Sequence, residues 1–186
     1  TARYGAASRF FLDELYGPTD FSRRDAQFAR IVPALVRLFP HEVVATVAAL
    51  GELHALSERL DSATAACLAA AQVTPREYIR VWQAAGQAAA RQAQIDLTLD
   101  VASQLDQFTR KPLLRNSLRL MRGPARAAGM AELQKFLETG FDSFRTMKGA
   151  EEFITLVASR ERALAFALFE AALDEARAAG FIGQNI

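Results

Sequence analysis

Apolar residues recur along this chain three or four positions apart, the spacing that keeps them on one face of an α-helix. No stretch alternates apolar and polar residues as a half-buried strand would, and no Asn-Gly or Asp-Gly pair indicates a hairpin. The pattern therefore predicts an all-α protein. We expect a single compact domain of about seven to nine helices, arranged as an orthogonal or irregular bundle.

Glycine, proline and capping residues divide this pattern into separate helices. The clearest start is at Thr74 and Glu77, which form a capping box with Pro75 at the first helical position. We expect helices over residues 6–16, 22–39, 41–60, 62–71, 75–108, 112–123, 130–147 and 150–179, and a short helix or turn over 124–128.

Three of these helices contain a candidate break. Pro33 should kink or split the second helix, because proline removes a backbone donor. The apolar pattern over 75–108 fits either one long helix or two helices with a joint near residues 92–96. The last helix has a candidate break near Ser159, and residues 183–186 should form a loose tail.

The composition fits one globular domain spanning residues 1–186. Hydrophobic residues make up 51% and charged residues 23%, so the chain can bury a sizeable core. Cys67 is the only cysteine, which excludes an internal disulfide and favours a reducing, cytoplasmic location. No apolar run is long enough for a transmembrane segment. The chain begins at Thr1 rather than at methionine, so an upstream targeting segment stays open.

Positive charge is concentrated between Asp106 and Glu132, a stretch with no acidic residue. We call residues 110–126 the basic segment. Its six basic residues are Arg110, Lys111, Arg115, Arg119, Arg122 and Arg126. The net charge of the whole chain is +1, and outside the segment 16 basic residues face 21 acidic ones. The basic segment is therefore the sequence feature that points to a partner, and that partner should be anionic.

The spacing within the basic segment predicts a cationic stripe. Arg115, Arg119 and Arg122 stand at i, i+4 and i+7, on one side of a helix that begins at Pro112. We expect this stripe to stay solvated and unpaired. The opposing interpretation is an ordinary helix face whose arginines pair with acidic residues of other helices.

Among anionic partners, the sequence favours an acidic protein surface or a second copy of the chain in a homodimer. An anionic phospholipid surface is the next candidate, because Leu113, Leu114 and Leu118 supply apolar contacts beside the arginines. Nucleic acid is less favoured, since no recognition-helix motif or interleaved aromatic residue accompanies the stripe. The sequence thus predicts a non-enzymatic binding or regulatory module.

Catalytic and metal chemistry finds little support in the sequence. The only histidines are His41 and His54, 13 positions apart, and no metal-binding motif surrounds them. No phosphate-binding glycine loop and no nucleophile elbow occurs. We therefore predict no catalytic residue, no cofactor and no metal, and an enzyme without a recognisable motif stays an alternative.

The phenylalanine content allows a different function. Thirteen phenylalanines either fill the core of a helical domain or line a cavity between its helices. In the second case the protein would carry or sense an apolar, lipid-like small molecule. We keep this as the main alternative to the binding module.

Several short motifs lie in the first third of the chain: residues 10–17 (FFLDELYG), 24–30 (RDAQFAR), 32–33 (VP) and 38–40 (LFP). Together they resemble a family of uncharacterised all-helical bacterial proteins. The resemblance implies a bacterial, cytoplasmic, helical domain. It implies no activity and no functional residue, because no activity is assigned to that family.

Overall fold

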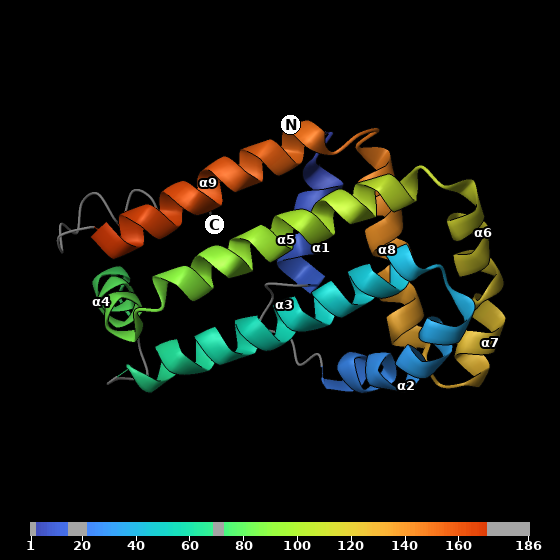
Figure 1. Ribbon diagram of the computed structural model, residues 1–186, viewed down its shortest axis with the longest axis horizontal. Coiled ribbons are helices and arrows are strands. Elements are labelled where there is room, and N and C mark those ends of the chain that lie inside the picture. The colour runs from blue at the N-terminus through green and yellow to red at the C-terminus, as the bar shows by residue number, and fades with distance from the viewer. Residues whose placement is uncertain (1–2, 15–21, 69–72, 171–186) are drawn as a thin grey trace. The chain divides into compact units, whose positions relative to one another are not determined.

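The computed structural model describes residues 3–14, 22–68 and 73–170, and within these ranges every regular element is an α-helix and no strand occurs. This confirms the all-α class predicted from the 3.6-residue period. The helices are α1 (Gly5–Glu14), α2 (Ser22–Leu38), α3 (His41–Ala66), α4 (Pro75–Ala85), α5 (Ala88–Thr109), α6 (Pro112–Leu120), α7 (Arg122–Ala127), α8 (Ala131–Thr146) and α9 (Glu151–Glu170) (Figure 1).

Contacts along the chain group into two compact units. Unit 1 consists of Thr1–Val47 and Val101–Ile154, and unit 2 consists of Ala48–Asp100 and Thr155–Ile186. Three long helices, α3, α5 and α9, each contribute residues to both units. The expectation of one domain over residues 1–186 stays a prediction.

Unit 1 is built around α8, which contacts α1, α2, α6 and α7. The buried ring of Phe10 on α1 lies 5.4 Å from the ring of Phe136 on α8, centroid to centroid. The side chain of Gln27 on α2 accepts a hydrogen bond from the backbone N–H of Leu133 at 3.0 Å. This bond satisfies one of the free donors at the start of α8 and fixes α2 against it.

A buried carboxylate holds the turn between α8 and α9 in unit 1. Asp106 on α5 accepts the backbone N–H of Ala150 at 3.0 Å, at the start of α9. It also accepts a hydrogen bond from Arg110 at 2.5 Å. From the other side, Arg3 donates through Nε to the carbonyl of Met147 at 2.9 Å. The turn that leads into α9 is therefore fixed by polar contacts from distant parts of the chain.

In unit 2, α4 begins as the capping box predicts. The Thr74 hydroxyl accepts a hydrogen bond from the backbone N–H of Glu77 at 3.2 Å. The predicted joint near residues 92–96 is wrong, because α5 runs without a break through them. The chain turns instead at Gly86 and Gln87, which both have φ of 63°. Glycine adopts this left-handed conformation without steric cost, so Gly86 ends α4.

The core of unit 2 contains a buried arginine. The guanidinium of Arg91 on α5 lies 4.1 Å above the ring of Trp82 on α4. It donates to the hydroxyl of Thr64 at 2.8 Å and to the carbonyl of Leu60 at 3.2 Å, both on α3. These contacts connect three helices of the unit through one side chain.

Two helices continue where a break was predicted. Pro33 lies inside α2 without splitting it, and both Pro33 and Ala29, whose carbonyl loses its partner, are exposed to water. Helix α9 passes through Ser159 unbroken. Helix α3 extends to Ala66, which joins the predicted 41–60 helix to the start of the predicted 62–71 helix. The predictions for residues 171–179 and for the 183–186 tail lie outside the described residues.

Within the described ranges, no helix combines the length and the apolar character needed to cross a membrane.

Candidate functional site

The basic segment folds into two short helices, and the boundary between them lies earlier than predicted. Proline at the first position starts α6, where its missing N–H costs nothing. We predicted that Gly123-Pro124 would end this helix, but the pair lies inside α7 and the break falls at Met121. The reason is that Pro124 has no N–H to donate to the carbonyl of Leu120, and its ring crowds that carbonyl. Arg122 therefore opens a second helix.

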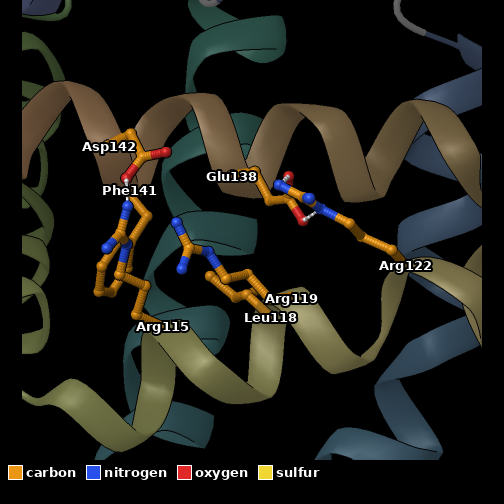
Figure 2. Close-up of a pocket in the computed structure, with 7 residues that line it drawn as sticks. All are labelled: Arg115, Leu118, Arg119, Arg122, Glu138, Phe141 and Asp142. Carbon is orange, nitrogen blue, oxygen red and sulfur yellow. Dashed lines mark hydrogen bonds and ion pairs between the residues drawn. The ribbon is translucent and has the colours of Figure 1, made fainter.

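Helix α8 carries the acidic residues that meet the basic segment. Figure 2 shows Arg115, Arg119 and Arg122 extending toward α8, with the guanidinium of Arg119 between the other two. Gln134 of α8 donates to the carbonyl of Leu118 at 2.6 Å, which ties α8 to the last turn of α6. A small pocket lies between the two helices; it is lined by Arg115, Leu118, Arg119, Arg122, Glu138, Phe141 and Asp142.

Arg122 is held firmly at one end of this pocket. Its Nε and Nη2 donate to the two oxygens of Glu138, each at 2.7 Å. Gln134 donates to the same carboxylate at 2.7 Å. The hydrogen bond from Arg122, followed by that from Gln134, holds the pKa of Glu138 below its ordinary value. A two-pronged arginine–carboxylate pair of this kind fixes the orientation of both side chains.

Arg115 is held more loosely at the other end. Its Nη2 lies 3.4 Å from Oδ1 of Asp142, and Nε of Arg145 lies 3.4 Å from the same oxygen. The Nε atom of Arg115 is buried and has no hydrogen-bond partner. Asp142 thus neutralises part of the charge of Arg115 but leaves one of its donors unsatisfied.

The two basic residues before α6 also pair within unit 1. Arg110 bonds to Asp106 as described above, and Lys111 donates to Glu42 at 2.7 Å. The expectation of an unpaired stripe is therefore wrong for Arg115 and Arg122, and Arg110 and Lys111 are paired as well. The partners of Lys111, Arg115 and Arg122 lie 16 to 69 positions away in sequence, so the absence of acids within the segment did not reveal them.

Arg119 and Arg126 differ from the other four basic residues. Both side chains are exposed, and neither forms an ion pair with any residue that the structure describes. Arg119 lies near enough to Glu138 for its charge to contribute to the lowered pKa of that carboxyl. Of the six predicted residues, these two keep a full set of hydrogen-bond donors for a partner.

Two leucines next to these arginines are unusually exposed. Leu113 and Leu120 expose 79% and 78% of their surface, and α6 has no buried residue. They stand seven positions apart, so they share one side of the helix. Leu114 and Leu118, which we named as apolar contacts beside the arginines, are instead half-buried toward the protein. We call Leu113, Leu120, Arg119 and Arg126 the outer face.

Leu120 is the residue that sequence reasoning missed, because its direction depends on which side of α6 packs against α8. Its spacing of seven from Leu113 was the available signal.

Among the described residues, no cluster of three or more histidine, cysteine, aspartate or glutamate side chains is placed to hold a metal ion. His41 and His54 are both exposed.

A protein-family model matches residues 1–175, and its description is "Domain of unknown function (DUF8198)". The match confirms the resemblance to an uncharacterised family, while the bacterial origin stays a prediction. No curated protein and no solved structure matches the chain.

Proposed function

The chain belongs to the family of the domain of unknown function DUF8198, and we propose that it is a non-enzymatic binding module that contacts an acidic partner through the outer face. The observation that carries this proposal is the exposure of Leu113 and Leu120 on α6, within the same basic segment as Arg119 and Arg126, two arginines without an ion pair among the described residues. We place the protein in the bacterial cytoplasm, where Cys67 stays reduced.

The apolar part of the outer face supports binding through its energetics. Burying a leucine side chain contributes roughly 1.5–3 kcal/mol, so two leucines left in water form a favourable contact for a partner. The arginines beside them add attraction at a distance and select a partner of opposite charge. Leucine and arginine together therefore favour a protein surface with acidic residues around an apolar patch.

The other anionic partners fit this face less well. A symmetric homodimer would bring Arg119 and Arg126 of two copies together, and the basic segment has no acidic residue to offset them. A phospholipid surface would receive only two leucines from a helix of nine residues. We therefore propose an acidic protein of different sequence as the partner, and the second copy and the lipid surface become outcomes of the test.

The test compares two double charge reversals. Arg119→Glu with Arg126→Glu reverses the outer face, and Arg30→Glu with Arg37→Glu is the matched control, since both control residues are exposed and seven apart on α2. Each variant and the unchanged chain are immobilised and exposed to cell extract at about 50 and about 300 mM salt.

We expect acidic proteins to be retained by the unchanged chain and by the control, to elute as salt rises, and to be lost with the outer-face variant. Retention that survives the outer-face reversal, or that both reversals weaken equally, contradicts the proposal. Purified chain is also analysed for self-association and for binding to anionic vesicles. If self-association or vesicle binding is observed and depends on Arg119 and Arg126, the partner is a second copy of the chain or an anionic lipid surface instead of an acidic protein.

A further inference from the structure

We infer that the pocket between α6 and α8 receives one carboxylate group of the acidic partner, held by Arg119 and Arg115. This inference rests on the proposed function and adds the chemical group that is recognised. It uses the side of the basic segment that faces α8, where Arg119 of the outer face converges with Arg115, whereas Leu113 and Leu120 supply the apolar contact.

Unsatisfied donors in the pocket carry the inference. Arg119 forms no ion pair with a described residue, and its guanidinium lies between those of Arg115 and Arg122 (Figure 2). The Nε atom of Arg115 is buried without a partner. Most buried polar groups in proteins are hydrogen-bonded, and an exception calls for an explanation such as a bound ion, a water or a strained contact. The pocket therefore has more donors than acceptors.

The arginines at the two ends of the pocket differ in how tightly they are bound to their carboxylate partners. Arg122 makes two bonds of 2.7 Å to Glu138 and has little to gain from a new acceptor. Arg115 meets Asp142 only at 3.4 Å, and Arg145 stays beside that carboxylate if Arg115 leaves. Arg115 is thus able to rotate toward a ligand and to bring its unsatisfied Nε into the new contact. Arg119 has no ion pair with a described residue to break before it binds a ligand.

The charge of the pocket favours an anion. Three guanidinium groups and two carboxylates line it, and Arg145 lies beside Asp142, so positive charge is in excess. A carboxylate balances that charge and matches the planar guanidinium of Arg119 with two parallel hydrogen bonds. A phosphate group carries up to two negative charges and would meet stronger repulsion from Glu138 and Asp142. Leu118 and Phe141 line the same pocket beside the arginines.

The experiment follows the arginine Nε–H signals of ¹⁵N-labelled protein by NMR during titration with propionate, with chloride holding the ionic strength constant. Propionate supplies a carboxylate on a short apolar stem. We expect the signals of Arg119 and Arg115 to shift. The signal of Arg122 should stay unchanged, since the guanidinium of Arg122 is already hydrogen-bonded to Glu138. Inorganic phosphate should produce smaller shifts at equal concentration.

Two single variants separate this inference from the proposed function. Arg119→Gln should weaken propionate binding about tenfold, the loss expected for one charge-assisted pair. Arg126→Gln should leave propionate binding unchanged, because Arg126 does not line the pocket, yet it should weaken capture of the protein partner. An unshifted Arg122 signal in both variants verifies that the α6–α8 contact is intact.

Two blocked peptides then identify the source of the carboxylate. One carries a single glutamate and no free terminus, and the other carries only a free C-terminal carboxylate. A shift of the Arg119 and Arg115 signals with either peptide supports the inference. The peptide that causes the shift identifies whether a glutamate side chain or a C-terminus supplies the carboxylate. Absence of any shift, equal shifts at Arg122, or tighter binding of phosphate overturns the inference, and partner capture that still depends on Arg126 leaves the proposed function standing.

Discussion

The ring of Phe10 on α1 lies so close to Gly140 on α8 that a Cβ atom at position 140 would come within 2.8 Å of its Cζ. Both residues are buried, so packed neighbours restrict any movement of the Phe10 ring away from position 140. A close approach of this kind accounts for a glycine in the middle of α8, where glycine costs about 1 kcal/mol of helix stability relative to alanine.

The first prediction is that Gly140→Ala lowers the free energy of unfolding. The added methyl group gains about 1 kcal/mol in helix propensity, but overpacking against Phe10 costs about 1–3 kcal/mol. Gly51→Ala is the control, because nothing lies within 4 Å of a Cβ there, and it should stabilise the protein by about 1 kcal/mol. Urea denaturation measures both; a stabilising Gly140→Ala would show that α1 and α8 are not in contact.

The second prediction concerns acid stability through Glu138. Its pKa is lowered in the folded protein by hydrogen bonds from Arg122 and Gln134, so the ionised carboxylate stabilises the fold at neutral pH. That stabilisation is present above the unfolded pKa, about 4.3, and is lost as pH falls through the lower folded pKa. Because the pair is partly exposed, its contribution should be about 1 kcal/mol.

Glu138→Gln should therefore be less stable than the unchanged chain at pH 7, with the difference shrinking toward pH 3. Thermal unfolding across that range measures it. Glu58→Gln is the control, since Glu58 is exposed and has no ion pair among the described residues. A pH-independent difference for Glu138→Gln would rule out the ionised pair as its cause.

The third prediction tests the buried carboxylate at the start of α9. Asp106→Ala leaves the N–H of Ala150 without an acceptor, and an orphaned buried donor costs about 1–3 kcal/mol. Arg110→Ala should cost less than about 1 kcal/mol, because Arg110 is mostly exposed. Denaturation of Asp100→Ala, an exposed residue of the same helix, provides the baseline. Equal losses from Asp106→Ala and Arg110→Ala would assign the effect to the ion pair alone.

The fourth prediction addresses the buried Arg91. Arg91→Met keeps most of the side-chain volume but removes the contact with Trp82 and the hydrogen bonds to α3. We expect unfolding to become easier by about 2–3 kcal/mol. Trp82 is the only tryptophan, so its fluorescence reports unfolding at this site. Arg59→Met, at an exposed position, should change stability little; an unaltered midpoint for Arg91→Met would contradict the structural role.

Periodicity and capping residues predicted the all-α class and where most helical segments lie, because both act within a few positions of the chain. The capping box at Thr74 is an example, since all of its partners lie within three residues. The turn at Gly86 was not predicted, because alanines continue the apolar pattern across it and nothing local requires the helix to stop. A helix boundary that depends on the conformation of one glycine leaves little signal in the local sequence.

The candidate site was predictable only in part. The six basic residues were identified by the absence of neighbouring acids, a property of the local sequence. Which of them keep free donors depends on Glu42, Glu138 and Asp142, and these reach the segment only through the fold. The exposure of Leu120 has the same origin. Sequence therefore located the segment, and packing decided which of its residues are open to a partner.

The carboxylates that pair with the basic segment also predict which partners it binds weakly. A long polyanion such as nucleic acid gains affinity from every cation that it neutralises, and four of the six in the segment already have an internal counter-ion. Such a polymer would release few ions on contact and would bind feebly at cellular salt. On the proposed function, we expect Glu138 and Asp142 to make this region select a single well-placed acid over diffuse negative charge.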